Sequence, residues 1–114
     1  MIRDVLRHFL AAIAYRTQKA LRDAPPHYPD FVAGRQVRTP VEILRHMTSL
    51  MGYARTFFDG GSYPVHPEPL PIFAAEIERF HQLVEALADR LGTDAPLHGI
   101  SDEQLLQGPL ADAM

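Results

Sequence analysis

Apolar residues recur at helical spacing in three long segments of this chain. In residues 2–22 the apolar positions are Leu6, Phe9, Leu10, Ile13, Ala20 and Leu21. In residues 40–59 they are Ile43, Met47, Leu50, Ala54 and Phe57, and in residues 73–91 they are Phe73, Ile77, Phe80, Val84, Leu87 and Leu91. Positions three and four residues apart lie on one face of a helix. Each segment is therefore predicted to be an amphipathic helix with one buried face.

Local signals set the ends of the second and third helices. Thr39 and Glu42 have the spacing of a capping box, and Pro40 stands at the first helical position, where no N–H is needed. The second helix is therefore predicted to begin at residue 40. Glycines can adopt the left-handed backbone that ends many helices, so Gly60-Gly61 and Gly92 are expected to end the second and third.

Two proline-rich connectors, residues 23–30 and 62–71, separate the three helices. Proline removes a backbone donor and holds its neighbour extended, so both connectors are predicted to be long crossings. Near the end of the chain, a second capping box predicts a short helical turn over residues 101–107. Pro109 is placed to open a further helix over residues 109–114. No segment alternates in polarity as a strand would, so we expect an all-α bundle of three long helices plus the start of a fourth.

Composition narrows the class of protein. With 114 residues, 46% hydrophobic and 22% charged, residues 1–114 suit a single domain with one core. The net charge is −3 and basic residues are scattered, which argues against nucleic acid as a partner. The apolar run over residues 9–14 is too short for a membrane span or signal sequence. We therefore expect a soluble, cytoplasmic protein without membrane contact.

The candidate chemistry lies on the predicted second helix. His46 falls at the edge of its apolar stripe, with Glu42 one turn before it, Ser49 one turn after and Tyr53 two turns after. Spacing alone allows two interpretations of His46, a boundary side chain covered by packing or a metal ligand. The chain has no cysteine, and this helix has no paired ligand at His-x-x-x-His or Glu-x-x-His spacing, so one histidine does not make a site.

The remaining candidate groups have simpler interpretations. His8 is predicted to be solvated, His81 to lie at the edge of the third helix's buried face, and His27 and His66 to be exposed in the connectors without a visible partner. The acidic residues beside the buried face of the third helix are expected to form a solvated surface. They are Glu76, Glu78, Glu85 and Asp89.

The order of these features resembles the DinB-like (DinB/YfiT) superfamily of bacterial four-helix bundles. The resemblance spans the whole chain and depends on five short stretches. These are Arg7-His8-Phe9-Leu10, residues 15–21, Val37-Arg38-Thr39-Pro40 with Leu44-Arg45-His46-Met47, residues 52–58, and Glu78-Arg79-Phe80-His81. It implies an up-down helical bundle with long crossover loops.

The resemblance also implies a metal site. In that family a histidine from the second helix and a His-x-x-x-His pair from the last helix hold a divalent metal, often nickel, zinc or iron. By motif position, His46 is the residue that takes this role here. The pair would be expected beyond Met114, so the domain is expected to be C-terminally incomplete and inactive alone. Glu42 would orient the His46 ring, and Tyr53 would lie nearby.

Two functions follow from these observations. The first is a metal-binding DinB-like protein, in its complete form a metal-dependent transferase or hydrolase. Such a protein would act on a small-molecule substrate with a low-molecular-weight thiol of the bacillithiol, mycothiol or glutathione type. The alternative is a non-catalytic helical module that forms a homodimer or binds a small apolar ligand. An incomplete gene product without activity of its own is a third interpretation.

Overall fold

The computed structural model describes residues 2–22, 24–34, 37–93, 96–105 and 107 of the chain. Its long helices are α1 (Ile2–Leu21), α2 (Pro40–Asp59) and α3 (Phe73–Leu91), with a short 3-10 helix, η1 (Tyr28–Asp30), and a one-turn helix, α4 (Asp102–Leu105). The described residues contain no strand. The all-α fold of three packed helices, predicted from the hydrophobic pattern, is confirmed.

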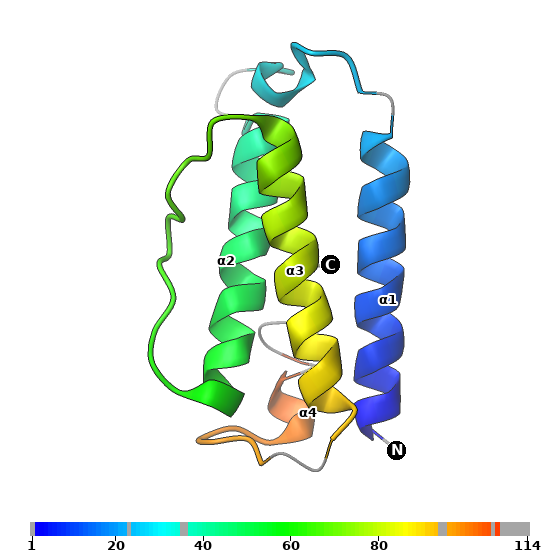
Figure 1. Cartoon of the computed structure of the whole chain (residues 1–114), viewed down its shortest axis with the longest axis vertical. Coiled ribbons are helices and arrows are strands. Elements are labelled where there is room, and N and C mark those ends of the chain that lie inside the picture. Colours follow the sequence, from blue (N-terminus) through cyan, green and yellow to red (C-terminus); the bar gives the residue numbers. More distant parts are fainter. Residues whose placement is uncertain (1, 23, 35–36, 94–95, 106, 108–114) are drawn as a thin grey trace.

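The first crossing joins two antiparallel helices, whereas the second joins two parallel ones. Figure 1 shows α1 running upward and α2 running back down beside α3, which also runs down. Helices α2 and α3 are therefore parallel, and the second crossing must return along the whole length of α2. A helix of that size is about 30 Å long, which an extended connector of this length can span. Extended, proline-rich backbone thus suits residues 60–72.

The helix ends follow the local sequence. Thr39 accepts a hydrogen bond from the Glu42 N–H through its side chain, and the Glu42 carboxylate accepts from the Thr39 N–H, so the predicted capping box is present. At the other end of α2, Gly60 and Gly61 have φ angles of 79° and 77°. These values lie in the left-handed region that glycine adopts without strain, which explains why α2 ends there.

The core lies between the three long helices. Fully or nearly fully buried apolar side chains come from α1, α2, α3 and α4: Leu6, Leu10, Ile13, Leu44, Met51, Ala54, Phe58, Phe80, Leu83, Val84, Leu87, Leu91 and Leu105. The predicted buried face of α3 is confirmed, with its first two members, Phe73 and Ile77, only partly buried. Phe80, at 0% exposure, lies at the centre of this face.

The predicted buried face of α2 was wrong by a rotation of about one residue. Ile43 is 45% exposed, whereas Val41, Leu44, Met51 and Phe58 are buried. The remaining residues of the predicted stripe, apart from the buried Ala54, are half-buried: Met47, Leu50 and Phe57. The cause is that α2 carries apolar residues over a wide arc. One part of the arc packs on α3, and the part with Ile43 faces a groove beside α1.

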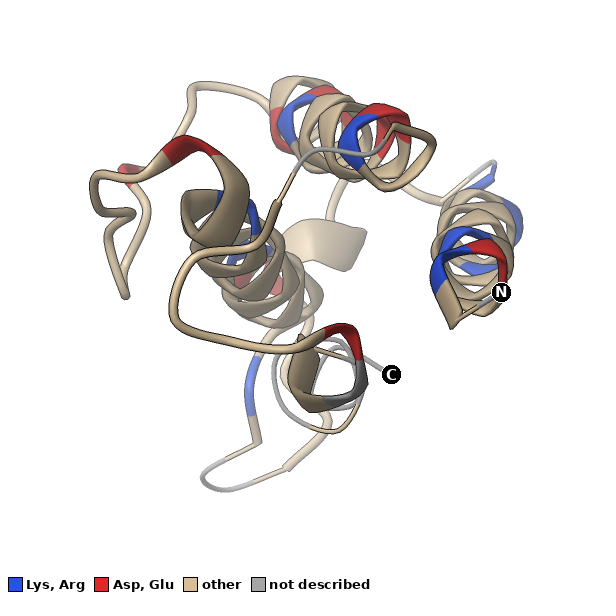
Figure 2. Ribbon diagram, turned by 90° about the horizontal axis from the view of Figure 1, so that it is seen from below, with Lys and Arg blue, Asp and Glu red and all other residues tan. Residues whose placement is uncertain are grey.

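The lower end of the bundle is closed by the segment that contains α4. Leu105 is fully buried, Arg3 of α1 pairs with Asp102 at 3.2 Å, and the His98 N–H donates to the Phe57 carbonyl at 2.7 Å. Seen along the helix axes, α4 lies on the side of the bundle opposite α3 (Figure 2). The predicted helix over residues 109–114 lies outside the described residues. No described helix is long and apolar enough to cross a membrane.

Candidate functional site

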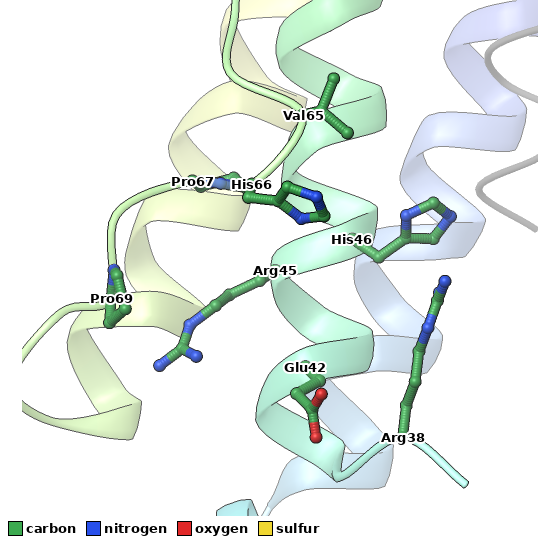
Figure 3. Close-up of a pocket in the computed structure, with 8 residues that line it drawn as sticks. All are labelled: Arg38, Glu42, Arg45, His46, Val65, His66, Pro67 and Pro69. Carbon is green, nitrogen blue, oxygen red and sulfur yellow. The ribbon is translucent and has the colours of Figure 1, made fainter. Parts of the chain in front are cut away.

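A cavity of about 460 Å³ lies between the first half of α2 and the second crossing (Figure 3). Its volume is within the range of small-molecule sites. Two segments far apart in the sequence contribute to it. Its lining residues are Arg38, Glu42, Arg45, His46, Val65, His66, Pro67 and Pro69.

The capping box fixes the residues that α2 contributes. Because Thr39 and Glu42 set the start of the helix, Glu42 and His46 lie one turn apart on the same exposed side. Arg45 precedes His46 by one residue and turns toward α3. His46 is exposed and faces the cavity from α2 (Figure 3). The sequence predicted His46 at the edge of the apolar stripe of this helix, and the structure leaves its side chain exposed.

Three contacts hold the second crossing against the helices and so place His66. The ring of Tyr63 lies directly over Gly52, where an added Cβ would come within 2.3 Å of it. The Ser49 hydroxyl donates to the Pro64 carbonyl at 3.0 Å, and the Arg79 guanidinium donates to the Glu68 carbonyl at 2.7 Å. Ser49, one turn after His46 on α2, is buried.

Arg45 is committed to a buried ion pair. Its Nε and Nη2 donate to the two carboxylate oxygens of Glu76 at 2.5 Å and 2.9 Å, and Arg79 donates to the same carboxylate at 3.2 Å. Glu76 is only 2% exposed, so the predicted solvated position for it was wrong. The hydrogen bond from Arg45 to Glu76, and then the charge of Glu76, raise the pKa of the Arg45 guanidinium above its usual range.

Glu42 is also engaged, but locally. Its Oε1 accepts from both the backbone N–H and the hydroxyl of Thr39, at 3.1 Å and 2.8 Å. These hydrogen bonds, the backbone one first, lower the pKa of the Glu42 carboxyl below its usual value of 4.5, with a smaller contribution from the charge of Arg38. The carboxylate therefore stays ionised and serves the helix cap.

Arg38 is the uncommitted cation of the cavity. Its side chain runs up along α2 toward the His46 ring, and the His66 ring is turned toward the same helix (Figure 3). Within the described part of the chain, its guanidinium makes no hydrogen bond or ion pair. Sequence reasoning missed the contribution of Arg38 to this cavity. The sequence did contain one signal for this contribution, because Arg38 directly precedes Thr39, the residue that caps α2.

The predicted metal ligand His46 and the two residues predicted beside it, Glu42 and Tyr53, lie in two places. His46 and Glu42 line the cavity, whereas Tyr53 is absent from the lining and packs edge-on against Phe57, with ring centroids 5.0 Å apart. His66 lines the cavity as a second imidazole, which sequence spacing could not reveal because it is twenty positions further along the chain.

The cavity does not fit a complete metal centre. Structural and catalytic zinc sites use three or four protein ligands. No group of three or more potential ligands, counting histidine, cysteine, aspartate and glutamate, occurs among the described residues. His46 and His66 could supply two ligands, but Glu42 is engaged by Thr39 and the cation of Arg38 lies nearby. The described part of the chain thus provides an incomplete ligand set.

A second opening lies on the other side of α2. This groove between α1 and α2, with a volume of about 180 Å³, is lined mainly by apolar groups. Its lining residues are Thr17, Ala20, Leu21, Tyr28, Pro40, Ile43, Leu44 and Met47. Unlike the histidine cavity, it contains no titratable side chain other than the phenol of Tyr28.

Comparisons with protein-family profiles, with curated proteins and with solved structures gave no match to this chain. The class that the fold defines is therefore an all-helical protein of three packed helices. The DinB-like resemblance stays a prediction.

Proposed function

We propose that this chain is a DinB-like helical bundle that binds a small molecule in the cavity beside α2. The observation that carries the proposal is that two imidazoles from separate segments, those of His46 and His66, line one cavity. The capping box fixes one, and the contact of Tyr63 with Gly52 helps to fix the other. Such pre-formed concave sites, lined by apolar walls and a few polar groups, are typical of ligand binding.

The proposal includes a divalent metal at His46 and His66, such as nickel, zinc or iron, completed by ligands from outside the described residues. A bound divalent metal would act as a Lewis acid and lower the pKa of a bound thiol or water. Transferase or hydrolase activity with a low-molecular-weight thiol would belong to this completed form. The residues described here hold the two imidazoles in place, and we assign no catalytic step to them.

The test is the metal content of the purified protein by mass spectrometry. We expect a transition metal in the wild type, lost in His46→Ala and reduced in His66→Ala. His8→Ala is the matched control, because His8 is an exposed histidine on α1 away from the cavity. A wild type without metal after incubation with nickel, zinc or iron, or equal retention in all three variants, would exclude the metal part of the proposal.

The apolar groove favours a second candidate, a non-catalytic module that forms a homodimer or binds a small apolar ligand there. Ile43 is 45% exposed in it, and exposed apolar surface often marks an interaction site. Under this hypothesis, light scattering should give the mass of a dimer for the wild type and of a monomer for Ile43→Asp. A monomeric wild type that binds no apolar dye would argue against both forms of this candidate.

A further inference from the structure

We propose that the cavity beside α2 binds an oxyanion, a carboxylate or phosphate group on a small molecule with a compact apolar stem, and that Arg38 is its main anion-binding residue. This inference uses the cavity of the proposed function and names the chemical class of its ligand. It does not require a metal.

The two arginines that line the cavity differ in whether their guanidinium groups already have partners in the protein. Arg45 is held by both oxygens of Glu76, so its charge is already balanced by a buried carboxylate. Arg38 is exposed and has no hydrogen bond or ion pair with any described residue. A guanidinium presents its N–H groups as a fork that matches the two oxygens of a carboxylate or phosphate. Arg38 is therefore free to bind such a group.

The two histidines add donors on the same side. Each imidazole has one N–H donor when neutral and two when protonated. Figure 3 shows the Arg38 side chain reaching toward the His46 ring, with the His66 ring turned toward them from the crossing. One guanidinium and two imidazoles thus line the same cavity, which is a donor set suited to an anion.

The one carboxylate among the lining residues, that of Glu42, does not use up these hydrogen-bond donors. Glu42 Oε1 accepts from both the N–H and the hydroxyl of Thr39. Figure 3 places this carboxylate toward the beginning of α2, away from the His66 ring. An incoming anion between Arg38 and the imidazoles would therefore approach the side of the cavity on which donors predominate.

The remaining wall limits the shape of the ligand. Val65, Pro67 and Pro69 line the cavity from the crossing, and Val65 is 72% exposed. These side chains offer no charge and no hydrogen-bond donor, so they suit an apolar group attached to the anion. A volume of about 460 Å³ has room for a small molecule rather than a polymer.

The test uses inorganic phosphate, acetate and benzoate as probes, at constant ionic strength, on protein freed of metal with a chelator that is then removed. Binding is followed by NMR titration of the His46 and His66 ring signals. We expect saturable shifts, and an affinity at least about tenfold lower in Arg38→Gln, as loss of a charge-assisted hydrogen bond predicts. The affinity of Arg38→Lys should lie between those of the wild type and Arg38→Gln, because lysine keeps the charge but lacks the forked arrangement of N–H groups.

Arg16→Gln is the matched control, because Arg16 is an exposed arginine on α1 outside the cavity. Its affinity should stay within about twofold of the wild type, since a surface charge at a distance is largely screened. Benzoate should bind more tightly than acetate. Absence of saturable shifts, or equal losses in Arg38→Gln and Arg16→Gln, would overturn the anion site, and equal affinity for benzoate and acetate would overturn the apolar stem.

The outcome is independent of the metal test. Phosphate binding by metal-free protein together with an absence of metal in the purified protein would support the anion site and reject the metal proposal. Metal bound through His46 together with no anion binding would do the reverse.

Discussion

Arginine and glutamate side chains around the beginning of helix α2 lie in two very different surroundings. On the side toward α3, Arg45 meets Glu76, whose side chain is 2% exposed, and both carboxylate oxygens accept hydrogen bonds. On the outer side, Arg38 and Glu42 are exposed, and Glu42 bonds only to the cap residue Thr39. The same residue types thus serve packing in one place and remain available to a ligand in the other.

The difference follows from solvation. A carboxylate removed from water must be compensated by partners at good geometry, which commits those partners permanently. An exposed guanidinium keeps its hydration and can exchange water for a ligand. Within this cavity, Arg38 is therefore the better candidate for binding, although Arg45 also lines it.

Among the changes that test this comparison, Glu76→Gln is expected to lower the free energy of unfolding most. The substitution leaves Arg45 and Arg79 without their shared counter-charge. Breaking a buried pair costs about 3–5 kcal/mol, and since the two arginines are 26% and 20% exposed we expect a smaller loss, about 2 kcal/mol. The measurement is the free energy of unfolding in urea.

Glu85→Gln is the control for this substitution, because Glu85 is exposed on the same helix. It should change the free energy of unfolding by less than about 0.5 kcal/mol. Equal unfolding midpoints for the two variants would show that the buried pair contributes nothing specific.

A smaller effect is expected from Gly52→Ala, which acts on the attachment of the crossing. The new Cβ would lie 2.3 Å from the Tyr63 ring, so the ring must move. Overpacking of this kind costs about 1–3 kcal/mol, partly offset by about 1 kcal/mol of improved helix propensity. We expect a net loss of stability together with changed NMR signals of His66.

Gly34→Ala controls for the general effect of an added methyl group, because its Cβ would make only an ordinary contact, 3.6 Å from Val37. If Gly52→Ala left the His66 signals unchanged, the Tyr63 contact would not be what positions the crossing.

Thr39→Ala is expected to have a still smaller effect, on the start of α2. It removes the side-chain oxygen that accepts from the Glu42 N–H. Loss of such a cap typically costs about 1 kcal/mol, whereas Thr39→Ser keeps the hydroxyl and should restore most of it. The free energy of unfolding measures both. A Thr39→Ser variant as unstable as Thr39→Ala would exclude the cap as the cause.

The smallest effect is expected from lowering the pH, which protonates the Glu42 carboxyl and weakens the cap of α2. Its pKa is lowered in the folded protein by the hydrogen bonds from Thr39. The stabilisation is therefore fully present above the unfolded value of 4.5 and is lost as the pH falls through the lower folded pKa. Hydrogen-exchange protection of the Thr39 amide should fall over this acidic range. Glu42→Gln should abolish the change, and an unchanged pH dependence in that variant would assign it to another group.

The local sequence predicted the helices well but did not predict which of their side chains other elements bury. The capping box of Thr39 and Glu42, and the buried face around Phe80, could be predicted because both depend on residues within a few positions of one another. The buried face of α2 could not, because Ile43 and Leu44 are equally apolar. Only the packing of the folded chain decided that Leu44 is buried whereas Ile43, which lines the same groove, is 45% exposed.

The candidate site shows the same division. From the sequence, His46 could be placed only at the edge of the apolar stripe of α2, since the cap sets the helical register. That His46, His66 and Arg38 line one cavity, and that Tyr53 does not, could be seen only in the folded chain. The sequence by itself determined where helices begin and end, through backbone hydrogen bonds and turn residues acting over a few positions. The tertiary structure decided which charges are buried and which side chains share the cavity, because burial depends on elements that are distant along the chain.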